Sequence, residues 1–160
     1  MEDLKRLITD GDMWEAGEGE NLGTPFLIRY RPHLHPFIAT QSYNKKITVF
    51  WRYDPVNASL MPSETDLELM NAVENSLVDH LERDVQSVLA FVYTGQNLRE
   101  WNWYSQDPKE AGLRINRALE AFDTMAIDIS TEDDPSWSAY EAVIEAGEEP
   151  EEDEMDEEED

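Results

Sequence analysis

The sequence predicts an α+β fold, with helices packed on one face of an antiparallel sheet. Two segments, residues 64–83 and 108–122, repeat apolar residues at the helical spacing of three and four. Short runs dense in β-branched and aromatic residues lie before, between and after them, as is typical of strands. The part of the chain before a strongly acidic C-terminus is long enough to bury a substantial core in one domain.

The N-terminal part predicts a short helical turn over residues 2–9 and then a β-hairpin. Its strands are residues 14–20 and 25–31, joined by a Gly-containing turn at 21–24. Two prolines within residues 31–36 interrupt the pattern. Because proline lacks an N–H and fixes φ, we expect a loop or a sheet edge there.

A strand and a capped helix follow. Residues 47–53 (ITVFWRY) predict the strand, and residues 54–62 predict a loop. Ser63 is a suitable helix N-cap, and Asp66 occupies the position of its capping-box partner. The helix over residues 64–83 carries one apolar stripe, made of Leu67, Met70, Val73, Leu77 and Leu81.

Two adjacent strands are predicted next. Residues 85–94 (VQSVLAFVYT) are apolar on both faces, which indicates a central strand. A turn at 95–97 leads into a second strand over residues 98–105. Side chains alternate along that strand, so Trp101 and Trp103 lie on one face. Glu100, Asn102 and Tyr104 lie on the other face.

The C-terminal part predicts a helix, a strand and a short last helix. Pro108 suits the first turn of the helix over residues 108–122, and residues 125–130 predict the strand. Asp134 and Pro135 form an N-cap followed by a first-turn proline. They open a helix that carries Trp137, Tyr140 and Ile144.

From residue 47 onward the order is strand, helix, strand, strand, helix, strand. This order predicts a ferredoxin-like split βαβ sandwich, with two helices on an antiparallel sheet. The added N-terminal β-hairpin extends that sheet or covers part of its other face. We therefore expect a single α+β domain over residues 1–146 and a disordered acidic C-terminal tail over residues 147–160.

The chain carries 37 acidic and 12 basic residues, a formal net charge of −25. Eleven of the acids lie in residues 148–160, a run that repels itself and has no apolar face to bury. Without them, 26 acidic and 12 basic residues leave the body at −14. Extended at ~3.4 Å per residue, the tail matches the charge spacing of one nucleic-acid strand and could compete for a basic surface. The alternative is a tail that only confers solubility.

Charge and composition exclude several classes of function. Coulomb repulsion opposes direct binding to DNA, RNA or an anionic membrane, and favours a basic protein partner. The absence of cysteine excludes disulfides, thiolate chemistry and Cys-ligated zinc. The N-terminus lacks a signal-peptide core, and no stretch approaches the ~20 apolar residues of a membrane span. We expect a soluble cytoplasmic protein.

No residue pattern predicts a catalytic or metal site. His33 and His35 are flanked by prolines and have neither a cysteine nor a third histidine nearby, and His80 suits the negative end of a helix. The chain lacks GxSxG, P-loop, GxGxxG and HExxH motifs. We expect no metal and no cofactor. The alternative is an enzyme of unknown reaction that uses Asp133, Asp134 and His33 or His35.

The aromatic residues allow two interpretations. Trp51, Trp101 and Trp103 fall on strands that should lie near one another. Core packing beneath the helices is the interpretation we favour. An exposed platform, as RNA-binding ferredoxin-like domains use, would have to overcome the negative charge of the body. Any exposed aromatic residues are therefore better explained by a protein interface.

Two short segments carry a resemblance to a known family: residues 99–104 (REWNWY) and residues 133–140 (DDPSWSAY), with Trp14 before a Gly-rich hairpin. With these features the chain resembles bacterial domain-of-unknown-function family 695 over about residues 12–144. The resemblance implies no established activity and no catalytic residue. That family is itself similar to regulator of ribonuclease activity B, a small acidic inhibitor of a ribonuclease, which by analogy implies a regulatory partner.

These observations predict a non-catalytic binding protein that inhibits or regulates a basic nucleic-acid-handling protein. A ribonuclease regulator and an immunity protein against a nuclease toxin both fit. The residues expected to bind the partner are the polar face of the strand over 98–105 and the acids of the tail: Glu100, Asn102, Tyr104, Glu151, Glu152, Asp153, Glu154, Asp156, Glu157, Glu158, Glu159 and Asp160.

Overall fold

A computed structural model describes residues 2–21, 23–53, 61–122 and 127–148 of the chain. In chain order its elements are α1 Glu2–Leu7, β1 Glu15–Asn21, β2 Thr24–Tyr30, α2 His35–Ala39, β3 Lys45–Arg52, α3 Glu64–Leu81, β4 Ser87–Gly95, β5 Leu98–Ser105, α4 Pro108–Leu119, β6 Ile127–Asp133 and α5 Ser138–Glu148.

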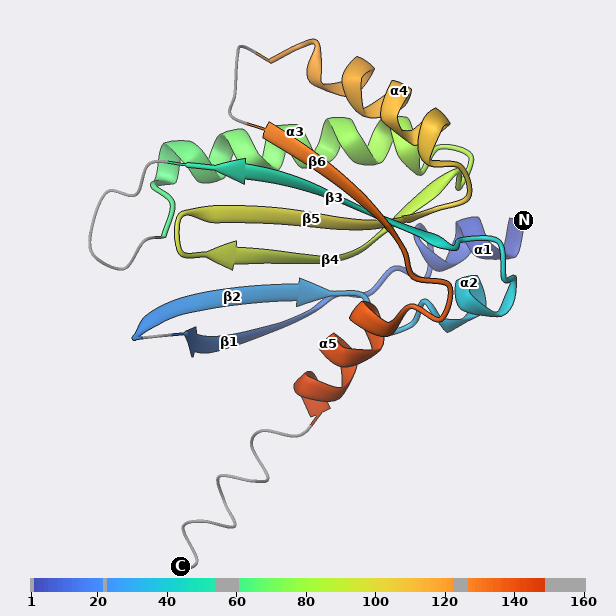
Figure 1. The fold of residues 1–160 in the computed structure, drawn as a ribbon, viewed down its shortest axis with the longest axis horizontal. Coiled ribbons are helices and arrows are strands. Elements are labelled where there is room, and N and C mark those ends of the chain that lie inside the picture. Colours follow the sequence, from blue (N-terminus) through green and yellow to red (C-terminus); the bar gives the residue numbers. More distant parts are fainter. Residues whose placement is uncertain (1, 22, 54–60, 123–126, 149–160) are drawn as a thin grey trace, which may run out of the picture.

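The six strands form one antiparallel sheet in the order β1-β2-β4-β5-β3-β6 (Figure 1). The hairpin β1–β2 extends the sheet, because β2 pairs with β4. β4 lies between β2 and β5, as its apolar character on both faces predicts. The α+β class is confirmed, and the sheet is larger than two helices on four strands.

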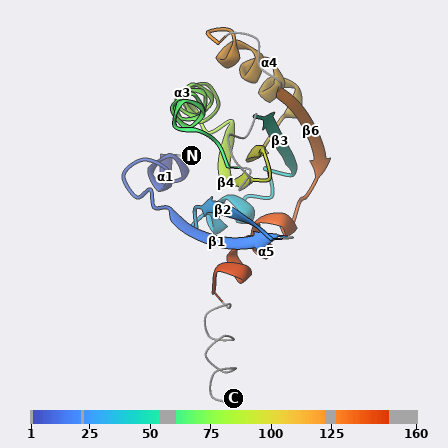
Figure 2. The same cartoon turned by 90° about the vertical axis from the view of Figure 1, so that its left-hand side faces the viewer.

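Helices α3 and α4 pack side by side over one face of the sheet (Figures 1 and 2). Trp101 and Trp103 on β5 are fully buried beneath them, and Trp51 on β3 is nearly so. Core packing of the three tryptophans is thereby confirmed. The helices contribute small and aliphatic side chains to the same core: Met70, Val73, Leu77, Leu81, Ala111, Ile115 and Ala118.

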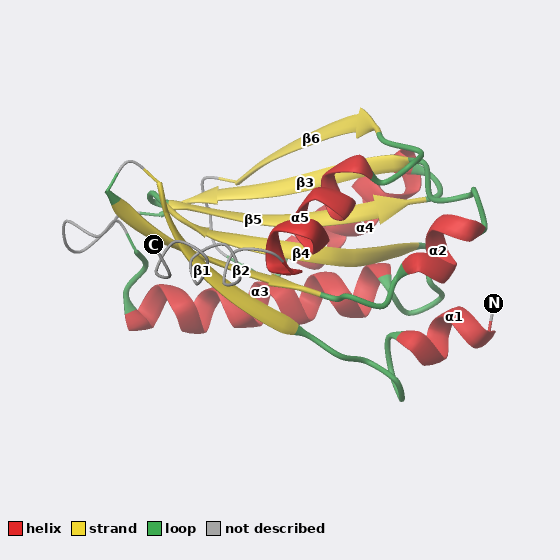
Figure 3. Ribbon diagram, turned by 90° about the horizontal axis from the view of Figure 1, so that it is seen from below, coloured by secondary structure: helices red, strands yellow, loops and turns green. Residues whose placement is uncertain are grey.

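A second core lies on the opposite face of the sheet, where α5 crosses the strands (Figure 3). The rings of Trp137 and Tyr104 stack with centroids 3.9 Å apart and planes 8° apart. Phe37 and Tyr43 pack edge-to-face beside them, and Tyr140 completes the cluster. One end of this second face is therefore closed.

The predicted starts of the two long helices are confirmed. Ser63 Oγ accepts a 3.1 Å hydrogen bond from the backbone N–H of Asp66 and caps α3. The Asp107 carboxylate accepts hydrogen bonds from the backbone N–H groups of Lys109 and Glu110 and caps α4.

Several boundaries differ from the prediction. The expected loop contains the start of the short helix α2, because a proline at the second helical position costs no helical hydrogen bond. The strand predicted to end at residue 130 continues as β6 to Asp133. The last helix begins at Ser138, since Asp134 and Trp137 form a turn in which Trp137 has a φ of 59°. α5 then continues to Glu148, two residues beyond the predicted domain boundary.

Candidate functional site

Glu100 lies in a row of side chains that crosses all six strands. Directly paired residues of an antiparallel sheet share one face. Trp101 and Trp103 point toward α3 and α4, so their neighbour Glu100 and its row lie on the other face. In strand order from β1 to β6, the row is Gly17, Ile28, Tyr93, Glu100, Phe50 and Asp128.

Two glycines shape the aromatic part of this face. The rings of Phe26 and Tyr93 stack with centroids 5.4 Å apart and planes 30° apart. A Cβ on Gly19 would lie 2.5 Å from Phe26 Cζ, and a Cβ on Gly95 would lie 2.7 Å from Phe26 Cβ. The Phe26 ring can therefore lie against the sheet only because both positions lack a side chain.

Glu100 itself is half-buried between these aromatic residues and Phe50. Its carboxylate makes no ion pair or hydrogen bond with any residue in the described part of the chain. The nearest basic residue in the register, Arg52, pairs instead with Asp128 at 3.5 Å. We call Phe26, Tyr93, Glu100 and Phe50 the Glu100 platform.

The platform lies at the end of the face that no described helix covers, which we call the open end. Figure 3 shows α5 and α2 toward one end of the strands, and no helix of the described part over the other end, where the β4–β5 hairpin turns. The four platform residues are each partly exposed, whereas the aromatic residues beneath α5 are buried. A macromolecular partner could reach the platform without displacing α5.

Two of the predicted partner-binding residues are in the closed part, which corrects that prediction. Tyr104 is fully buried under Trp137, and its hydroxyl donates a 2.7 Å hydrogen bond to Asp134 Oδ2. Burial and the Asp134 carboxylate together raise the pKa of Tyr104.

Asn102 is 1% exposed, so it too is unable to touch a partner directly. Its Oδ1 accepts a 2.9 Å hydrogen bond from Thr48 Oγ1, while its Nδ2 has no acceptor among the described residues. Of the three strand residues, only Glu100 remains a contact candidate. The predicted tail residues, Glu151 to Asp160, lie outside the described residues.

The residues considered for catalysis do not converge. His33 Nε2 lies 2.7 Å from the carbonyl oxygen of Leu7, and His35 Nε2 lies 3.3 Å from Glu141 Oε1. Asp133 on β6 pairs with Lys45 on β3, and both side chains are exposed. No group of three or more His, Asp or Glu side chains in the described ranges is arranged to hold a metal ion.

Asp134 has a structural role. Its carboxylate accepts hydrogen bonds from the backbone N–H groups of Ser138 at 2.8 Å and Ala139 at 3.1 Å, which caps α5. Burial acts to raise the pKa of Asp134, but the hydrogen bonds from Tyr104 and these two N–H groups outweigh it and lower the pKa. Asp134 thus satisfies the first N–H groups of α5, but the predicted N-cap position followed by Pro135 in the first turn is wrong, because the helix starts at Ser138.

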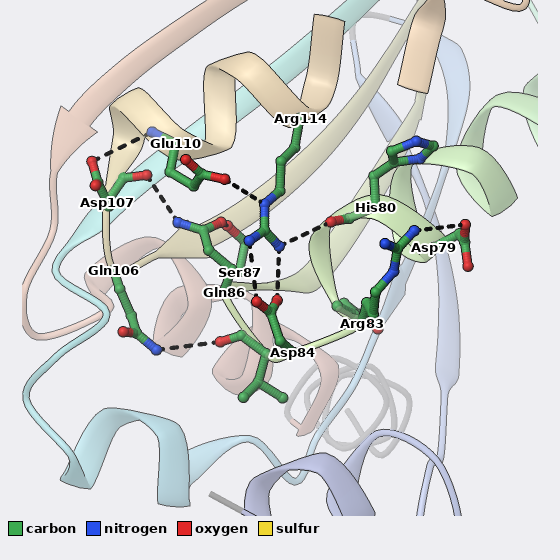
Figure 4. Close-up of polar contacts among 12 residues, drawn as sticks. Asp79, His80, Arg83, Asp84, Gln86, Ser87, Gln106, Asp107, Glu110 and Arg114 are labelled. Atoms are coloured by element: carbon green, nitrogen blue, oxygen red, sulfur yellow. Dashed lines mark hydrogen bonds and ion pairs between the residues drawn. The ribbon is translucent and has the colours of Figure 1, made fainter. Parts of the chain in front are cut away.

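A polar pocket of about 180 Å³ lies between the end of α3 and α4 (Figure 4). Its centre is Arg114, which bonds Asp84 through both terminal nitrogens at 2.7 and 3.1 Å and Glu110 through Nε at 2.9 Å. Arg114 also donates to the His80 carbonyl oxygen at the end of α3. The hydrogen bond from Arg114 lowers the pKa of Asp84. Because the guanidinium is occupied by the protein itself, we assign this pocket to helix–helix attachment.

A buried ion pair that no sequence pattern predicts joins the end of β2 to the end of α3. Arg31 donates to Glu82 at 2.7 Å and, through Nε, to Asp12 at 2.9 Å. Burial raises the pKa of Glu82, and Arg31 works against that shift. The guanidinium also lies 4.7 Å from the centroid of the Trp14 ring. Partners so distant along the chain leave no local pattern in a single sequence.

The comparison with protein families settles the resemblance. The sequence profile of a family of unknown function, DUF695, matches residues 12–143. This chain belongs to that family. No curated protein and no solved structure matches it. Membership in DUF695 supplies no activity. No described helix of this DUF695 chain is long and apolar enough to cross a membrane.

Most basic residues of this DUF695 domain are paired with its own carboxylates. Eight of its twelve Lys and Arg residues make ion pairs with its own carboxylates. A ninth, Lys5, donates to the carbonyl oxygens of Glu82 and Arg83. Several exposed carboxylates have no such pair within the described ranges: Glu18, Glu20, Glu64, Glu68, Glu120 and Glu145.

Proposed function

We propose that this protein is a non-catalytic acidic binding protein that docks on a basic, nucleic-acid-handling protein and inhibits or regulates it. The single observation that carries the proposal is the internal use of the basic residues. Since most Lys and Arg side chains are neutralised by the protein's own carboxylates, the remaining exposed acids set the outward potential.

Such a surface has defined consequences for partners. It repels nucleic acids and anionic membranes, and it raises the association rate with a cationic protein. A basic protein that handles nucleic acid offers a surface already suited to a dense row of negative charges. Occupation of that surface by this chain would exclude the nucleic acid.

The open end of the sheet supports a docking face for that partner. It presents partly exposed aromatic residues around the Glu100 carboxylate, which has no ion-pair partner in the described part of the chain. This arrangement suits an anchor surrounded by charged residues. The exposed acids on β1 and α3 would supply steering, and the tail acids would add to it.

We further propose that β3 to β6, with α3 and α4, form a ferredoxin-like unit. The strand order β4-β5-β3-β6 and the placement of both helices on one face support this. A link to regulator of ribonuclease activity B, and a cytoplasmic location, are part of the same proposal. A ribonuclease regulator and an immunity protein against a nuclease toxin are both compatible with it.

Affinity capture from the native host tests the proposal. The immobilised full chain is incubated with lysate at low salt, and retained proteins are eluted at high salt and identified by mass spectrometry. We expect a basic nuclease or nucleic-acid-binding protein, and we expect its activity to fall when the purified chain is added in stoichiometric amount.

The matched control is a resin that carries polyglutamate at the same charge density. Proteins retained equally by both resins bind through charge alone and do not count as partners. Recovery of no nucleic-acid-handling protein specific to the chain would overturn the proposal. A chain lacking residues 148–160 separates the contribution of the tail, which should alter association rate and salt dependence more than partner identity.

A further inference from the structure

We propose that the Glu100 platform binds one cationic side chain of the partner, with arginine preferred. This inference rests on the proposed function, because it names what the basic partner would place on the open face. Its central observation is a half-buried carboxylate that is flanked by aromatic rings and has no ion-pair partner among the described residues.

The register places the required groups within reach of one cation. Side chains that face each other across an antiparallel pair have Cβ atoms about 4.5–5.5 Å apart. Glu100 is paired in this way with Tyr93 on one side and with Phe50 on the other. A guanidinium lying on the Tyr93 ring would therefore also reach the Glu100 carboxylate.

The aromatic part of the platform depends on a specific packing arrangement. Phe26 stacks on Tyr93, and it can do so only because Gly19 and Gly95 leave room for its ring and backbone. Aromatic faces attract cations within ~6 Å of the ring centroid, and a planar guanidinium stacks on them better than an ammonium does.

Two arginines of this protein are bound by the same combination of an aromatic ring and a carboxylate. Arg31 lies 4.7 Å from the Trp14 ring centroid while it pairs with Asp12 and Glu82. Arg99 lies 5.5 Å from the Trp101 ring centroid and 3.7 Å from Glu74. Each arrangement joins an aromatic ring, a carboxylate and a guanidinium.

At the Glu100 platform the ring and the carboxylate come from this chain, but no described basic residue pairs with Glu100. Arg52, the nearest in the register, is held by Asp128. Charge also selects the occupant: the net charge of −25 disfavours an anion such as a nucleotide, and the half-buried carboxylate disfavours a purely apolar segment.

A titration followed by NMR tests the site without knowledge of the partner. The labelled full chain is titrated with N-acetyl-arginine amide and, separately, with the neutral isostere N-acetyl-citrulline amide. We expect saturable shifts of the Glu100 carboxyl and Tyr93 ring signals with the arginine compound and none with the citrulline compound.

Two variants of equal charge locate the effect. Glu100→Gln should weaken arginine binding about tenfold, because it removes the charge-assisted contact. Glu120→Gln removes one exposed carboxylate just past α4 and should leave the affinity within about twofold, since exposed charges are screened. A Phe26→Leu variant, checked by urea unfolding, should also weaken binding while it keeps an apolar side chain.

Shifts spread evenly over exposed acids, or equal affinity of wild type and Glu100→Gln, would overturn the inference. The proposed function fails separately. If capture still recovers a specific basic partner but the Glu100→Gln variant binds it normally, the proposed cation site is rejected and the proposed function is retained. If the platform binds arginine but no nucleic-acid-handling protein is captured, the proposed cation site is retained and the proposed function is rejected.

Discussion

The hydroxyl of Tyr104 on β5 donates a 2.7 Å hydrogen bond to Asp134 Oδ2, the carboxylate that caps α5. The contact ties a central strand to the start of the last helix. It also brings Trp137 onto the Tyr104 ring. α5 is thereby fixed over one end of the sheet, and Glu100 is left at the other end.

Tyr104→Phe should lower the free energy of unfolding by about 1.5–3 kcal/mol, the range for a hydrogen bond to a charged group. The ring stacking on Trp137 is retained, so the loss reports the hydroxyl. Urea unfolding measures it. In an Asp134→Ala background the same substitution should cost much less, and an equal cost in both backgrounds would mean that the contact does not stabilise the fold.

Asp134→Asn should give a pH-dependent loss of stability. The folded pKa of Asp134 lies below its usual value, so the ionised carboxylate stabilises the fold at pH values above the unfolded pKa of about 3.9. That contribution disappears as pH falls through the lower folded pKa. Urea unfolding, measured at low protein concentration, should show a constant difference in unfolding free energy between variant and wild type above about pH 5. This difference should shrink below about pH 4. A difference that grows on acidification would contradict the assignment.

Removal of either partner of the buried Arg31–Glu82 ion pair should strongly lower the free energy of unfolding. Arg31→Met or Glu82→Gln alone should cost about 3–5 kcal/mol, because each leaves a buried group without its partner. The double variant should cost less than the sum of the two. Arg83→Met, which removes an exposed pair with Asp79, is the matched control and should change stability by less than about 1 kcal/mol.

Gly95→Ala should destabilise the protein by about 1–3 kcal/mol, because the new Cβ would lie 2.7 Å from Phe26 Cβ and 3.1 Å from the Pro25 carbonyl oxygen. Gly17→Ala is the control on the same face, with Ile28 Cγ2 at 3.7 Å, an ordinary contact. It should be neutral. Urea unfolding and the Phe26–Tyr93 nuclear Overhauser effects compare the two, and equal effects would contradict the packing role of Gly95.

Local signals predicted the elements well. Ser63 and the proline after Asp107 identified helix starts that the structure places at the expected residues, and residues 98–105 form β5 as predicted. These features depend on capping and alternation, which act over a few residues. α2 was missed because two prolines near it favour a loop as strongly as a first helical turn.

The candidate site was only half predictable. Alternation along β5 correctly grouped Glu100, Asn102 and Tyr104 on one face. Which part of that face is covered depends on where α5 docks, through contacts between Tyr104 and residues about 30 positions later. The Glu100 platform likewise depends on the pairing of β2 with β4, which brings Phe26 to Tyr93. Single-sequence patterns carry no information on such long-range pairing.

The most direct test of the central claim is a competition between this chain and nucleic acid for the captured basic protein. Fluorescence anisotropy of a labelled oligonucleotide bound to that protein is followed as the full chain is added. We expect stoichiometric release of the oligonucleotide, with an apparent affinity that weakens as salt rises. Anisotropy that stays constant while the chain is bound at saturation would contradict it.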